Sequence, residues 1–85
     1  MVNMMISCDQ YDYIEIVCTF QYPIKVTMKL GDVVECVALD TARNENKEEC
    51  IKVNLNGADS LIVLDDISVM EVCVENPHFK IVSFI

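Results

Sequence analysis

The first 24 residues contain neither lysine nor arginine, although they carry Asp9, Asp12 and Glu15. The six basic residues of the chain all lie from Lys25 onward, against 14 acidic residues and a formal net charge of −8. Proteins that bind nucleic acids neutralise phosphates with lysine and arginine, so this balance argues against direct binding of RNA or DNA. An acidic surface often serves solubility alone. Here three acidic residues lie in a segment that holds no basic residue, which favours presentation of negative charge to a basic partner.

The chain lacks cysteine pairs at the spacing of a disulfide scaffold or a zinc site. There is no Cys-x-x-Cys pair, and His78 is the only histidine. The odd number of cysteines predicts buried free thiols in a reducing cytosol, without a metal site. These cysteines are Cys8, Cys18, Cys36, Cys50 and Cys73.

Residues that could perform catalysis are also scarce. His78 is the one candidate general base, and it follows Pro77 in a predicted turn. The neighbouring acids Asp65 and Asp66 lack the ligand spacing of a calcium or magnesium loop. The carboxylates of an exposed helix offer no enclosed cleft for acid–base chemistry. We therefore expect a binding protein rather than an enzyme.

No apolar run approaches the roughly 20 residues that span a bilayer. The opening residues have no basic segment and no small-residue cleavage site, so no signal peptide is predicted. At 85 residues and 53% hydrophobic composition, the chain is expected to form one globular domain over 1–85, with residues 1–6 flexible.

Residues 7–18 have the pattern of a short helix. Ser7 with Gln10 fits a capping box, and the pair Asp9 and Asp12 is the alternative frame. At 100° per residue, one side of the helix is apolar and should pack on the rest of the domain. That side comprises Tyr11, Ile14, Val17 and Cys18. The acids Asp9, Asp12 and Glu15 fall within about 120° of each other on the other side. This arc is either a contact surface or an ordinary solvated face.

After Pro23 the hydrophobic period changes from helical to two. Gly31-Asp32, Asn56-Gly57 and Asp65-Asp66 supply turns between short strands. The strands are predicted at Lys25–Leu30 (with Val26, Met28 and Leu30 inward), Val33–Leu39 continuing toward Ala42, Glu49–Leu55, Ser60–Leu64 and Ile67–Val74, with Phe79–Ile85 as a candidate extra strand. The pattern predicts a mainly β (α+β) fold: a short N-terminal helix followed by a five-stranded, strongly bent antiparallel barrel.

This order of elements resembles the Sm-like fold. The opening residues 6–15, Ile-Ser-Cys-Asp-Gln-Tyr-Asp-Tyr-Ile-Glu, with Cys18 closing the helix, resemble the Rho-binding antiterminator (Rof/YaeO) family. The likeness continues through the turn at residues 29–32 and the Leu-Asp-Asp-Ile element at residues 64–67, and it covers roughly residues 6–84.

The resemblance implies an inhibitor of Rho-dependent transcription termination in the bacterial cytoplasm. Members of the family bind the hexameric termination factor Rho at the primary RNA-binding region of its N-terminal domain and block RNA loading. The corresponding contact residues here would be Asp9, Gln10, Asp12 and Glu15 on the helix. Arg43, Asn44 and Lys47 would contribute from a loop, for which the alternative is a solvated turn. No cofactor is implied, and we expect the chain to be a monomer. The alternative is an acidic adaptor that binds another basic protein surface.

Overall fold

The computed structural model describes residues 8–84, apart from the side chains of Cys8 and Asp9. The expected flexibility of residues 1–6 therefore lies outside the described residues. One helix, α1 (Cys8–Thr19), precedes all the strands, as the sequence predicts. The strands are β1 (Pro23–Met28), β2 (Val33–Arg43), β3 (Glu49–Leu55), β4 (Ala58–Val63), β5 (Ile67–Val72) and β6 (Ile81–Ser83), with a 3₁₀ turn η1 (Leu64–Asp66) between β4 and β5.

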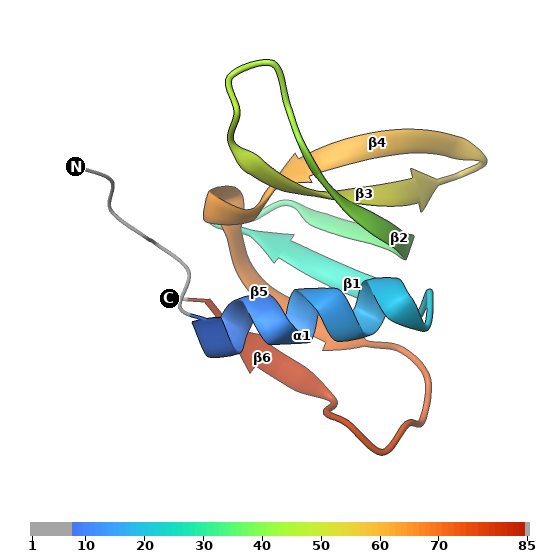
Figure 1. Cartoon of the computed structure of the whole chain (residues 1–85). Coiled ribbons are helices and arrows are strands. Elements are labelled where there is room, and N and C mark those ends of the chain that lie inside the picture. Colours follow the sequence, from blue (N-terminus) through green and yellow to red (C-terminus); the bar gives the residue numbers. More distant parts are fainter. Residues whose placement is uncertain (1–7, 85) are drawn as a thin grey trace.

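The strands form one curved antiparallel sheet in the order β4-β3-β2-β1-β5-β6 (Figure 1). The mainly β, strongly bent architecture is confirmed, although the sheet has six strands rather than five and stays open. The sixth strand is the candidate extra strand, shortened to three residues and paired with β5 through Val69–Ser83 and Glu71–Ile81. It covers the edge that β5 would otherwise expose.

The first strand starts and ends two residues earlier than its alternating pattern predicts. Its turn begins directly after Met28, whose N–H donates to Asp32 O at 2.7 Å while Gly31 N donates to Met28 O at 2.8 Å. Gly31 has φ 103°, a conformation that favours glycine. The prediction that Leu30 faces the core was wrong: Leu30 lies in this turn and is 95% exposed.

The hairpin between β3 and β4 agrees with its sequence signal. Asn56 and Gly57 both have positive φ, at 55° and 90°, as a two-residue type I′ turn requires. The third strand has the predicted bounds, with Ile51 and Val53 fully buried and Leu55 packed against the core.

The predicted apolar side of α1 packs against the sheet. Ile14 and Val17 are completely buried, Cys18 is buried, and Tyr11 is partly buried against the same core. The core that they join comes mainly from the inward faces of the strands: Ile24, Val26, Cys36, Ala38, Ile51, Val53, Leu64, Ile67, Met70, Val72 and Phe84. Within residues 8–84, no helix has the length and apolar character needed to cross a bilayer.

The thiols that the structure describes follow the expectation with one exception, and the side chain of Cys8 lies outside the described residues. Cys18, Cys36 and Cys50 are free and buried, as small hydrophobic side chains. Cys73 is also free but exposed, because it lies just beyond the end of β5.

Candidate functional site

The solvent side of α1 carries exposed carboxylates. Asp12 and Glu15 are both exposed, one helical turn apart. Asp9 belongs to the first turn of the same helix, although its side chain is outside the described residues. Because the helix contains no lysine or arginine, nothing on α1 itself neutralises these charges.

Gln10 has a structural contact that the sequence did not indicate. Its side-chain Nε2 donates to the backbone oxygen of Ser83 in β6, at 3.0 Å. This bond connects the start of the helix to the last strand of the sheet. Gln10 therefore positions the helix, whatever further contact it makes. Ser7 is not among the described residues, so the capping box stays a prediction.

The other end of α1 is closed by a Schellman motif. Tyr22 N donates to Val17 O at 3.0 Å, and Gln21 N donates to Cys18 O at 3.2 Å. Gln21 adopts φ 52°, in a position where glycine is the usual residue. Fixed at both ends and buried along one side, α1 presents its carboxylates from a rigid backbone.

A β-bulge adds Asp40 to the acidic face. Val34, Cys36 and Ala38 point inward along β2, so strict alternation would also bury Asp40. The pairing register with β3 shifts between Ala38 and Asp40, and beyond this bulge Asp40 is exposed. Sequence reasoning missed this residue. The available signal was an aspartate at an inward position of a predicted strand.

Asp40 lies beside the C-terminal half of α1. A shallow hollow of about 380 Å³ there is lined by Glu15, Cys18, Thr19, Asp40 and Thr41. Burial, together with the charges of Asp40 and Glu15, raises the pKa of the Cys18 thiol to about 12. Two carboxylates from different elements thus converge on one thiol, and the acidic face extends from the helix onto β2.

The loop between β2 and β3 has a defined internal structure. Asn44 Oδ1 accepts from the N–H groups of Asn46 and Glu48 at 2.9 and 3.0 Å, while its Nδ2 donates to Glu48 Oε1 at 2.8 Å. Arg43 donates to Lys47 O at 3.3 Å and lies 3.8 Å from a carboxylate oxygen of Glu49.

These contacts separate the roles of the three loop residues. The groups of Asn44 shape the loop, Arg43 has Glu49 of β3 as an acidic neighbour, and both Arg43 and Lys47 are exposed. The loop stands at the top of Figure 1, away from α1 at the bottom. The structure therefore does not bring the two predicted contact regions together.

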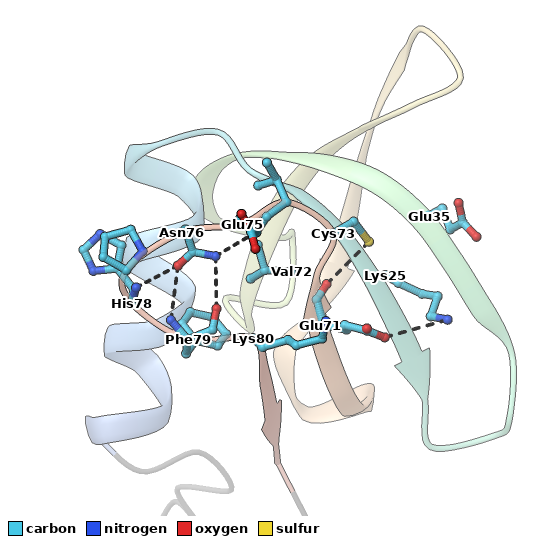
Figure 2. Close-up of a pocket in the computed structure, with 12 residues that line it drawn as sticks. Lys25, Glu35, Glu71, Val72, Cys73, Glu75, Asn76, His78, Phe79 and Lys80 are labelled. Atoms are coloured by element: carbon cyan, nitrogen blue, oxygen red, sulfur yellow. Dashed lines mark hydrogen bonds and ion pairs between the residues drawn. The ribbon is translucent and has the colours of Figure 1, made fainter.

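A second hollow, of about 950 Å³, lies between the outer face of the sheet and the segment before β6 (Figure 2). Its walls mix both charges: Lys25 forms an ion pair with Glu71 at 3.8 Å, and Glu35, Glu75 and Lys80 also line the hollow. Among the described residues, no group of three or more histidine, cysteine, aspartate or glutamate side chains is placed to hold a metal ion.

Fold and site together define a small acidic β domain with a carboxylate-bearing N-terminal helix. The model of the family "Modulator of Rho-dependent transcription termination (ROF)" matches residues 5–84, and the chain belongs to this family. It is thus a modulator of Rho-dependent termination. No protein among the curated sequences is similar enough to the chain to count as a match.

A solved structure agrees with this assignment. The chain is 46% identical to YaeO of Vibrio cholerae O395, a structure described as bound to magnesium. The two superpose with a TM-score of 0.82, covering 87% of this chain and 96% of that chain. The resemblance drawn from the helix motif and the order of strands is confirmed.

Proposed function

We propose that this protein inhibits Rho-dependent termination by placing the acidic face of α1 on the primary RNA-binding region of Rho, where it blocks RNA loading. The observation that carries the proposal is the pair of exposed carboxylates Asp12 and Glu15 on a helix without lysine or arginine, which Asp40 of β2 joins beside Glu15. Membership of the family points to Rho as the partner. The protein then acts where Rho acts, in the bacterial cytoplasm.

Electrostatic complementarity supports the choice of surface on Rho. A region that grips RNA must offer cations to phosphates, and carboxylates can occupy the same cations. Because the contact would be between charged surfaces, affinity should fall as salt rises, with a screening length of about 8 Å near physiological ionic strength. The mechanism is exclusion of a ligand, with no bond made or broken.

A rigid helix should make the domain an effective competitor of RNA for the surface of Rho. Ile14 and Val17 anchor α1 in the core, Gln10 bonds to Ser83, and the C-terminal cap fixes its exit. A preorganised surface loses less conformational entropy on binding than a flexible acidic segment would. We infer that the domain binds the Rho hexamer as a monomer.

The proposal assigns the loop residues a secondary role. Arg43 and Lys47 are both exposed there, while Arg43 and Asn44 also hold the shape of the loop through their hydrogen bonds. The magnesium of the Vibrio relative is given no part, because the described carboxylates do not form a cluster suited to it. Nor does the proposal include catalysis: His78 stacks on Phe20 at 5.0 Å instead of facing a nucleophile.

Competition with a labelled oligo(dC) bound to purified Rho tests the proposal. The wild-type domain should displace the oligonucleotide at low salt and less well at moderate salt. Asp12→Lys/Glu15→Lys should abolish displacement, because it places cations against a basic surface. The matched control is Asp32→Lys/Glu35→Lys, which changes the net charge equally at exposed positions near the β1–β2 turn and should retain at least part of the activity.

The outcomes separate the alternatives. Equal loss in both double variants would show that only net charge matters, which contradicts a specific role for α1. Failure of the wild-type domain to displace the oligonucleotide would remove the primary site of Rho as the target. A different basic partner recovered by pull-down would then favour the acidic-adaptor alternative.

A further inference from the structure

An exposed aromatic cluster lies at the C-terminal end of α1. Phe20 directly follows the helix, and its ring stacks on Tyr22 at 5.4 Å and on His78 at 5.0 Å between centroids. We call these three rings the Phe20 platform. Although it has two ring neighbours, Phe20 is 53% exposed.

The distances favour one open face on Phe20. Tyr22 and His78 have centroids 6.4 Å apart. Rings stacked on opposite faces of Phe20 would be separated by about 7 Å or more, twice the roughly 3.5 Å contact distance between carbon atoms. The 6.4 Å separation favours a position of both neighbours toward the same face of Phe20, and the 53% exposure of the residue shows that part of its side chain meets solvent.

Two distant segments hold the platform in place. Tyr22 is fixed by the Schellman motif through its N–H to Val17. His78 belongs to the segment before β6. Asn76 Oδ1 accepts from His78 N at 2.8 Å, and Asn76 Nδ2 donates to Val74 O and Phe79 O. Figure 2 shows Asn76 bonded inside this segment and His78 beside the helix. The platform is thus preorganised.

The same segment makes a second aromatic contact with the helix. Phe79 packs on Tyr13 with ring centroids 4.6 Å apart. This contact explains the half-buried state of Tyr13. It also means that the segment before β6 is attached to α1 at two places, one along the helix and one at its end.

Charge around the platform favours a cation. Asp12, Ile16 and Phe20 follow one another at spacings of four, so Phe20 ends a row that begins with an acid. The last turn of α1 contains no basic residue to complement the negative end of the helix dipole. The face of an aromatic ring is itself electronegative. Nucleobases also stack on aromatic rings, but a net charge of −8 repels their phosphates.

We propose that the open face of Phe20 receives an arginine side chain of the basic protein surface that α1 binds. Arginine fits better than lysine because its planar guanidinium stacks on aromatic faces and is weakly hydrated. The inference rests on the proposed function for its partner, Rho. It adds an aromatic contact at the end of the helix to the carboxylate contacts along it.

Substitutions at Phe20 separate the contribution of the aromatic face from that of apolar volume. Phe20→Leu keeps apolar volume and loses the π face, whereas Phe20→Tyr keeps both. Phe20→Ala and Phe20→Leu should weaken binding to purified Rho by about 3- to 30-fold, the range of a cation–π contact from an exposed to a desolvated site. Phe20→Tyr should stay within about twofold of wild type by the same reasoning. Val33→Ala, at an apolar residue with 55% exposure near the opposite end of β1, is the matched control and should bind like wild type.

Rho variants identify the arginine that stacks on Phe20. Each arginine of its N-terminal RNA-binding region is changed to lysine in turn and titrated with wild-type protein and with Phe20→Leu. One variant should weaken wild-type binding but should weaken Phe20→Leu binding much less, because the stacked pair is already lost. Equal effects on both proteins for every arginine would overturn the proposal. So would wild-type affinity in Phe20→Leu, with unchanged urea midpoints confirming that the variants are folded.

The two proposals fail in different ways. Loss of binding with Asp12→Lys/Glu15→Lys but not with any Phe20 variant overturns the platform and leaves the proposed function standing. Absence of Rho binding by the wild-type domain overturns the proposed function and, with its partner removed, the platform as well.

Discussion

Alkylation of Cys18 should report whether the acidic helix is docked on the sheet. The thiolate is the reactive form of cysteine. An ordinary thiol with a pKa of 9.0 is about one-tenth ionised at pH 8, whereas a pKa of about 12 leaves roughly one thiolate in ten thousand. The difference predicts labelling of Cys18 about a thousandfold slower in the folded protein than in the unfolded chain. Burial of the Cys18 side chain between α1 and the sheet slows the reaction further.

The assay is iodoacetamide labelling at pH 8 with peptide mapping by mass spectrometry. The reference is Cys18 itself in the urea-unfolded chain, and exposed Cys73 should be the first of the described cysteines to react in the folded protein. Cys36 and Cys50 should also be protected, because burial raises the pKa of both thiols. Native labelling of Cys18 within tenfold of its unfolded rate would refute the docked arrangement of α1.

A variant that neutralises Asp40 tests the second cause of the raised Cys18 pKa, which is the charge of that carboxylate. Asp40→Asn removes one of the two carboxylates near Cys18 and should lower the pKa of the thiol, so labelling accelerates. The acceleration should stay below about tenfold, because burial is the larger cause. Glu35→Gln, an exposed acid elsewhere on β2, is the matched control and should leave the rate unchanged. An Asp40→Asn rate equal to the control would contradict the position of Asp40 beside the helix.

Stability measurements by urea unfolding give the remaining predictions. Gln21→Gly should stabilise the protein by about 1 kcal/mol and raise Tm by about 4–8 °C, since φ 52° strains a residue with a side chain; a destabilised variant would contradict the cap. Ile14→Ala should lose about 2–5 kcal/mol, whereas Leu30→Ser should stay within about 0.5 kcal/mol, and equal effects would be inconsistent with their burial. Asn44→Ala should lose about 1–2 kcal/mol through its loop hydrogen bonds, and an unchanged midpoint would show that these bonds contribute nothing. The folded Cys18 thiol keeps its proton to about pH 12 while the unfolded one ionises near 9.0, so its contribution is complete below about pH 9 and is lost as pH rises toward 12. A Cys18→Ala variant should lack this part of the alkaline decline, and an identical decline in both proteins would argue against it.

Local sequence signals predicted much of the secondary structure, because they depend on neighbouring residues. The helical period placed Ile14 and Val17 in the core, and β3 was predicted with its observed bounds. Asn56-Gly57 predicted its hairpin, since few other pairs tolerate two positive φ angles. The prediction for Leu30 was wrong because the alternation of apolar residues continues through Lys29 and Leu30, although the backbone has already turned after Met28.

The candidate site depended more on tertiary structure. Sequence alone identified the acidic residues of α1, since their arc follows from helix geometry within a single element. Asp40 could not be assigned to that face, because a bulge reverses the direction of its side chain and the fold then brings it to Glu15. The contact of Gln10 with Ser83 joins residues 73 positions apart, which no local pattern encodes.

The sequence by itself thus determined the mainly β fold class, the charge and the helix that carries the charge, because these depend on composition and local periodicity, while the family followed from the resemblance of the helix motif. Only the tertiary structure decided which distant groups complete that helix. The platform formed by Phe20, Tyr22 and His78 exists because the chain end folds back along α1, so its rings meet across 58 residues of sequence. Contacts of this kind are set by how the sheet bends and how its last strand pairs, and those are properties of the whole chain.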